Sequence, residues 1–196
     1  MRGSFEFSSR FLDALVKVAE RVELITELEY REFEMSPKMS FNLMAFALGP
    51  YKKYDCGFFR ETIPVEFYCQ TGSERLMEAN LSRLERLTKA GLQFYEEYLK
   101  TPYPFSKYGN LFAPHFSFNA MENPGLVLIN QKNLLSPETG YDYWSVINRD
   151  RMILHEMAHM WMGNLFTMSE WHDLWLKEAT AEYFCHKSFS AILDDE

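Results

Sequence analysis

Apolar residues recur at helical spacing in three long segments of the chain. The first opens at a capping-box signature, Thr71-x-x-Glu74, and continues to about Leu99. Its inward stripe consists of Met77, Leu81, Leu84, Thr88, Gly91, Tyr95 and Tyr98. The second runs from Tyr143 to Met162 before a Gly163-Asn164 stop, and the third from Leu174 to Phe189 after N-cap residues at 169–173. The short connection predicts that the last two helices form an antiparallel hairpin.

Shorter apolar runs between turn residues predict strands. These runs are Tyr30–Phe33, Phe41–Leu48, Ile63–Cys69, Leu111–Ala113 and Leu126–Ile129, with breaks at Gly49-Pro50 and Thr71-Gly72. A small sheet against a helix bundle is an α+β fold. Phe11–Ile25 also has helix-like spacing, but its charged residues exclude a signal sequence or a membrane span.

Composition favours a folded domain and narrows the choice of partners. At 47% hydrophobic and 16% aromatic, 196 residues can bury a substantial core. The net charge of −8 argues against nucleic acid or an anionic membrane as partner. It would favour cationic ligands, although a solvated acidic surface is the commoner cause of such a charge. Three cysteines cannot all pair, and reduced thiols are a simpler interpretation than a Cys56–Cys69 bridge. Reduced thiols predict a cytoplasmic location.

The second predicted helix carries the run His155-Glu-Met-Ala-His159, in a chain with five histidines. Histidines four residues apart lie on one face of a helix, so both imidazoles can reach one metal ion. Glu178 follows after 18 residues, about one turn into the next helix. Together His155, His159 and Glu178 predict a His₂Glu site for one Zn²⁺ per chain, with the fourth position open. The alternatives are an ordinary amphipathic helix and a solvated Glu178.

Glu156 lies beside this predicted site, and Glu182 lies one turn after Glu178. Zinc lowers the pKa of a bound water toward ~7 and polarises a carbonyl. We expect Glu156 to act as general base toward that water and then to carry the proton to the leaving amine. Glu182 is expected either to hydrogen-bond a ligand imidazole or to be a plain helix-face glutamate.

Three motifs occur in order: Ala120-Met-Glu-Asn123, His-Glu-x-x-His-x-Trp-x-Gly-Asn-Leu from His155, and Trp175-Leu-Lys-Glu178. Together they resemble the zinc aminopeptidases of the aminopeptidase N type, and a weaker similarity extends from about Tyr30 to Phe189. The resemblance implies a thermolysin-like zinc metallopeptidase catalytic domain over residues 51–196, incomplete at its C-terminus. Residues 1–50 would then be an N-terminal segment and the end of a β-rich domain.

The resemblance also implies a substrate and a role for the first motif. Glu122 would bind the α-ammonium of a peptide with a free N-terminus, while Ala120, Met121 and Asn123 lie along the substrate. An α-amino group is largely protonated near neutral pH, so a carboxylate suits it. The implied activity is removal of N-terminal residues from peptides. Glu122 alone is also compatible with a loop or edge-strand carboxylate.

Departures from the family pattern leave two further hypotheses open. Asn119, Pro124, Met160, Met162 and Ala179 replace the usual residues, and Asn119 adds a side chain where glycine is common. The family's oxyanion-binding tyrosine would fall beyond Glu196. The first alternative is therefore a weakened or inactive homologue that binds zinc and peptides, or a partner, without efficient turnover. The second is an endopeptidase, in which Glu122 would lose its role.

Overall fold

The computed structural model describes residues 37–136 and 142–193. From Asn42 onward the chain forms one compact unit, which the following description concerns. The strand expected at Tyr30–Phe33 and the helix-like segment at Phe11–Ile25 lie outside the described residues. The division of the chain at residue 50 stays a prediction.

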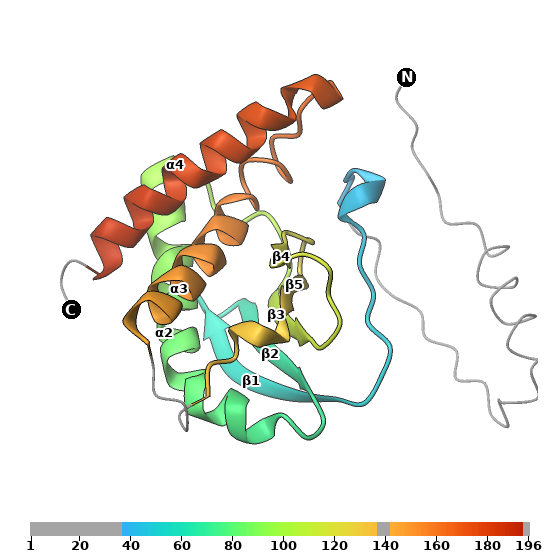
Figure 1. The fold of residues 1–196 in the computed structure, drawn as a ribbon. Coiled ribbons are helices and arrows are strands. Elements are labelled where there is room, and N and C mark those ends of the chain that lie inside the picture. The colour runs from blue at the N-terminus through green and yellow to red at the C-terminus, as the bar shows by residue number, and fades with distance from the viewer. Residues whose placement is uncertain (1–36, 137–141, 194–196) are drawn as a thin grey trace, which may run out of the picture. The chain divides into compact units, whose positions relative to one another are not determined.

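The sheet contains strands β1 (Tyr51–Phe59), β2 (Ile63–Gln70), β3 (Tyr108–Ala113), β4 (Ala120–Met121) and β5 (Val127–Asn130). Their order across the sheet is β1-β2-β3-β5-β4 (Figure 1). Strands β2, β3 and β5 are parallel, whereas β1 and β4 run antiparallel to their neighbours. The short β4 strand therefore lies at one edge of the sheet, next to β5.

Three long helices accompany the sheet: α2 (Glu74–Leu99), α3 (Tyr143–Ala158) and α4 (Leu174–Leu193). Helix α2 is the crossover between the parallel strands β2 and β3 and packs against β1 and β2. Helices α3 and α4 form the predicted hairpin, and α4 also packs on α2 (Figure 1). Short 3₁₀ helices occupy Phe41–Leu43, Gln131–Asn133 and Trp171–Asp173. The fold is mixed α and β, with a small sheet and three helices.

The prediction of a strand at Phe41–Leu48 is wrong. A 3₁₀ turn is followed there by irregular chain, and Phe46 and Leu48 are 78% and 94% exposed. The strand forms instead at Tyr51–Phe59, because that segment can pair with β2 across the tight loop at 60–62. Arg60 and Glu61 adopt positive φ values of 50° and 60° there, which reverses the chain. The apolar run alone did not contain this pairing information.

Helix α3 ends at Ala158, four residues before the predicted end at Met162. Beyond Ala158 the turn of the backbone is wider than in an α-helix, because the backbone N–H of Asn164 donates to the carbonyl of His159, five residues earlier, at 3.0 Å. Gly163, with φ of 138°, completes the turn, so the predicted stop signal is where the chain reverses. The predicted capping box is also out of register. Thr71 bonds the carbonyl of Pro50, and α2 begins at Glu74.

The core between the helices and the sheet fixes the position of α3. Trp161, Tyr95, Phe67, Phe112 and Leu154 are among its largest fully buried side chains. Tyr95 on α2 donates its hydroxyl hydrogen to the carbonyl of Leu154 on α3 at 2.8 Å. Nearby, a Cβ at Gly91 would lie 2.8 Å from the side chains of Leu154 and Met157, so this glycine allows α2 and α3 to approach closely. Close packing against α2 and the hydrogen bond from Tyr95 thus fix the position of α3.

Two remaining expectations concern the cysteines and membrane spans. Cys56, Cys69 and Cys185 are all buried and free, in agreement with the interpretation as reduced thiols. Among the described residues, no helix combines the length and the apolar character needed to cross a membrane. The cytoplasmic location stays a prediction.

Candidate metal centre and active site

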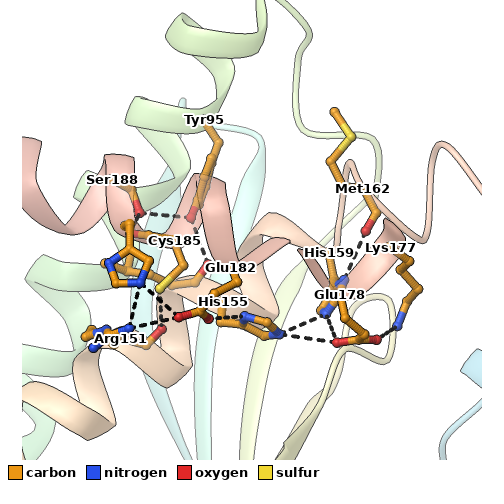
Figure 2. Close-up of polar contacts among 12 residues, drawn as sticks. Tyr95, Arg151, His155, His159, Met162, Lys177, Glu178, Glu182, Cys185 and Ser188 are labelled. Carbon is orange, nitrogen blue, oxygen red and sulfur yellow. Dashed lines mark hydrogen bonds and ion pairs between the residues drawn. The ribbon is translucent and has the colours of Figure 1, made fainter. Parts of the chain in front are cut away.

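The end of α3 and the start of α4 bring the predicted metal ligands together (Figure 2). The Nε2 atoms of His155 and His159 lie 3.1 Å apart. Oε2 of Glu178, in the first turns of α4, lies 3.5 Å from Nε2 of His155 and 3.4 Å from Nε2 of His159. Three potential ligand atoms from two helices therefore converge on one point.

Hydrogen bonds on the far side of each imidazole determine its tautomer. Nδ1 of His155 lies 3.0 Å from a carboxylate oxygen of Glu182, and Nδ1 of His159 lies 2.9 Å from the carbonyl of Met162. An ionised carboxylate and a carbonyl can only accept, so both Nδ1 atoms carry the hydrogen. The Nε2 lone pairs then face each other and the carboxylate of Glu178. Three such acceptors repel one another unless a cation lies between them.

The spacing of these atoms fits a zinc ion. In a tetrahedral site with bonds of about 2.0–2.1 Å, neighbouring ligand atoms lie about 3.3–3.4 Å apart. The observed separations of 3.1, 3.4 and 3.5 Å lie close to this range. The contact between Glu182 and His155, one of two possibilities from the sequence, is present and orients this imidazole for a metal.

The local charges favour cation binding at this point. His155 and His159 hold the pKa of Glu178 well below its ordinary range, which outweighs the effect of its burial. Burial lowers the pKa of His155, but Glu178, Glu156 and Glu182 outweigh it and raise the pKa above the ordinary value. Carboxylates thus surround the imidazoles, and a positive charge is stabilised between them.

Glu156 faces the same site from α3. Its side chain is buried, with 7% of the residue exposed. Carboxylate oxygens of Glu156 and Glu122 and a ring nitrogen of His159 all lie within 4.8 Å of one another. Burial raises the pKa of Glu156 to about 7, although the two histidines act in the opposite direction. A carboxyl group with a pKa near neutrality is suited to both accepting and releasing a proton.

Glu122 approaches the site from the edge of the sheet. It directly follows β4, in which Ala120 and Met121 pair with Ile129 and Leu128 of β5. The side-chain amide of Asn164 donates to the backbone carbonyl of Glu122 at 2.7 Å, and this bond connects the turn after α3 with the end of β4. Asn123 likewise donates from its side chain to the carbonyl of Leu43 at 3.0 Å. These bonds fix the backbone on both sides of the Glu122 side chain.

The substituted positions fit their surroundings. Asn119 is exposed and does not adopt a positive φ, so its side chain brings no backbone strain. Met160 is fully buried, and its sulfur lies 3.5 Å from the amide nitrogen of Asn164. Met162 supplies the carbonyl that orients His159. His172, outside the site, has a side chain that is 76% exposed.

Sequence reasoning missed the residues that support these groups. Lys177 contacts both Glu122 and Glu178, Asn164 holds the Glu122 backbone, and Arg151 pairs with Glu182 at 2.8 Å. Asn164 and Lys177 both belong to the three motifs, but Asn164 was interpreted as a helix stop and Lys177 was given no role of its own. Nε2 of His186 also lies 3.0 Å from a carboxylate oxygen of Glu182.

Comparison with known proteins agrees with this geometry. The sequence profile of the peptidase family M1 domain matches residues 84–196, which is more than half of the chain. The chain therefore belongs to peptidase family M1.

Several curated relatives are aminopeptidases. The chain is 35% identical to an aminopeptidase N of Streptomyces lividans over 154 residues, covering 78% of this chain and 18% of that protein. It is 29% identical to a leucyl aminopeptidase of Saccharolobus solfataricus, covering 98% of this chain and 24% of that one. It is also 34% identical to the human endoplasmic reticulum aminopeptidase 2, covering 83% and 16% respectively. The chain thus spans less than a quarter of the length of these relatives.

Proposed function

We propose that this chain is the zinc-binding catalytic part of an aminopeptidase that removes N-terminal residues from peptides. The observation that carries the proposal is the convergence of two Nε2 lone pairs and one carboxylate oxygen at 3.1–3.5 Å. The names of the relatives support the substrate class. The small sheet and the adjacent helix that leads to both histidines also support assignment of the chain to a thermolysin-like catalytic domain.

His155, His159 and Glu178 would hold the ion, with Glu182 and the Met162 carbonyl orienting the imidazoles. When bound, zinc supplies Lewis-acid chemistry, because it lowers the pKa of water toward about 7 and polarises a peptide carbonyl. Glu156 accepts the proton of the attacking water and delivers it to the leaving amine. Its pKa of about 7 suits both transfers.

Glu122 binds the α-ammonium of the substrate and thereby sets which peptide bond is cleaved. The residue is 4% exposed, and one of its carboxylate oxygens lies within 4.8 Å of a carboxylate oxygen of Glu156 and a ring nitrogen of His159. An ammonium bound there would be held beside Glu156 and His159, which would bring the first peptide bond, rather than an internal one, to the residues that would hold the metal. A peptide that lacks the terminal charge would bury Glu122 without supplying an ammonium partner to the carboxylate oxygen that Lys177 does not contact, which disfavours its binding. Edge strand β4, with Ala120 and Met121, would support the substrate backbone.

The test measures release of a chromophore from an aminoacyl amide by the purified chain, with and without chelator. We expect one zinc per chain and chelator-sensitive turnover, and no cleavage of the N-acetylated substrate. Glu156→Gln is expected to retain zinc and lose turnover, because only the proton acceptor is removed. A chain that takes up no zinc would contradict the proposal. Zinc uptake without any turnover would instead indicate a binding protein, and equal cleavage of blocked substrates an endopeptidase.

A further inference from the structure

Lys177 contacts both Glu122, the proposed ammonium-binding residue, and Glu178, a proposed metal ligand. Its Nζ atom lies 2.5 Å from Oε1 of Glu122 and 2.6 Å from Oε1 of Glu178. The lysine side chain is only 11% exposed, although it stands in the first turn of α4. Figure 2 shows its ammonium group beside Glu178, on the side away from His155. One cation therefore links the end of β4 to the start of α4.

Glu178 uses its two oxygens for different partners. Oε2 faces both histidines, and Oε1 faces Lys177. Because the carboxylate is held at both ends, its rotation about the terminal bond is fixed with Oε2 toward the metal position. In Glu122, Lys177 contacts Oε1. The other oxygen of Glu122 takes no part in this ion pair.

The path of the lysine side chain depends on Gly163. A Cβ at this glycine would lie 2.9 Å from Cε and 3.4 Å from Cδ of Lys177, and 3.3 Å from Nδ1 of His159. Gly163 also has a φ of 138°, which side chains rarely tolerate. The aliphatic part of Lys177 therefore crosses the backbone just after the histidine helix, where only glycine leaves room.

We propose that Lys177 is a positioning residue that sets the separation between the metal ligand Glu178 and the amine-binding Glu122. This inference rests on the proposed function, since it assumes those two roles. In an aminopeptidase, the distance from the ammonium site to the metal determines which peptide bond is attacked. Lys177 acts on that distance through both carboxylates without touching the reacting atoms.

The test compares Lys177→Met, which keeps the length of the side chain but not its charge, with Lys177→Arg and Lys177→Gln. Lys187→Met is the matched control, because Lys187 is exposed on the same helix and its ammonium group lies over the ring of Tyr183, 5.6 Å from the ring centroid. We measure zinc affinity by competition with a chelator, and KM and kcat on an aminoacyl amide. Lys177→Met and Lys177→Gln should bind zinc about 10–100-fold more weakly. Their KM should rise more than their kcat falls, Lys177→Arg should restore part of both, and Lys187→Met should match the wild type.

Two results would overturn the inference. Unchanged zinc affinity together with a lower KM would mean that Lys177 competes with the substrate ammonium for Glu122. Unchanged zinc affinity and unchanged KM would mean that it positions neither carboxylate. Failure of the proposed function is distinct, because it would appear in the wild type as absent turnover. The zinc titration would then still decide whether Lys177 positions Glu178.

Discussion

A buried ionic network on α3 gives the most direct test of how the metal-binding helix is held. Asp150 is fully buried and accepts hydrogen bonds from Nε and Nη2 of Arg149 at 2.9 and 2.8 Å. It also accepts one from Nε of Arg83 on α2 at 2.7 Å. Asn80 on α2 accepts from Nη1 of Arg149 and donates to the carbonyls of Leu76 and Leu135. The network joins α2 to α3, five residues before His155.

Asp150→Asn keeps the shape of the side chain and removes its charge. The guanidinium of Arg149, whose side chain is 2% exposed, then has no counter-charge, and the amide cannot accept at both oxygen positions. Leaving one partner of a buried ion pair uncompensated costs about 3–5 kcal/mol. Total stabilities of domains are about 5–15 kcal/mol. The substitution should therefore remove about a fifth or more of the free energy of unfolding.

Urea unfolding with linear extrapolation measures this loss, with a chelator present so that metal binding does not contribute. Glu85→Gln is the matched control, since it also removes one carboxylate charge from an ion pair. Its partner is Lys89, and the two side chains are 37% and 34% exposed. We expect the control to change stability by less than about 0.5 kcal/mol. If both variants lose similar amounts, burial does not determine the strength of the network and the reasoning is refuted.

Three further predictions concern the site and the thiols. Glu182→Gln should weaken zinc binding about 10–100-fold, because Glu182 orients His155; unchanged affinity in chelator competition would contradict this. Gly163→Ala should destabilise the chain by about 1–3 kcal/mol in urea unfolding, since the new Cβ meets Lys177; unchanged stability would mean that the lysine moves freely. Burial raises the pKa of Cys56 to about 11 and of Cys185 to about 12. Thiol reagents at about pH 8 should therefore label the folded chain slowly, and label all three cysteines in denaturant; rapid labelling of the folded chain would argue against burial.

The elements that the sequence predicts well are those with a strong period of their own. Helix α2 was expected from the capping signature to about Leu99 and spans Glu74–Leu99. Helix α4 begins at Leu174 as expected, and Glu178 lies one turn into it. Strand β2 begins at the predicted Ile63, and the expected Leu111–Ala113 lies within β3. In each case the local apolar spacing and the flanking turn residues carry the signal.

The elements that the sequence predicts poorly depend on a partner far along the chain. Strand β1 contains Lys52, Lys53 and Asp55, and its pairing with β2 decides its conformation. The apolar run at 41–48 had the better strand composition but has no sheet partner among the described residues. The last residues of the predicted α3 leave the helix because the chain must turn at Gly163 toward β4, where Asn164 holds Glu122. Tertiary contacts overrode local preference at each of these places.

The same distinction separates the reacting groups from the groups that align them. His155, His159 and Glu178 are recognisable because helical geometry relates their spacing to a common point, so the chemistry can be inferred before the fold is known. Lys177 and Asn164 act through bonds between elements, and nothing in their spacing distinguishes them from helix-face or turn residues. The spacing of Glu182, one turn after Glu178, left two interpretations open, and the contact between elements decides between them. Yet a ligand atom that is misdirected by even a small rotation no longer faces the cation. Variants of the supporting residues, rather than of the ligands, therefore test whether this arrangement functions as a metallopeptidase site.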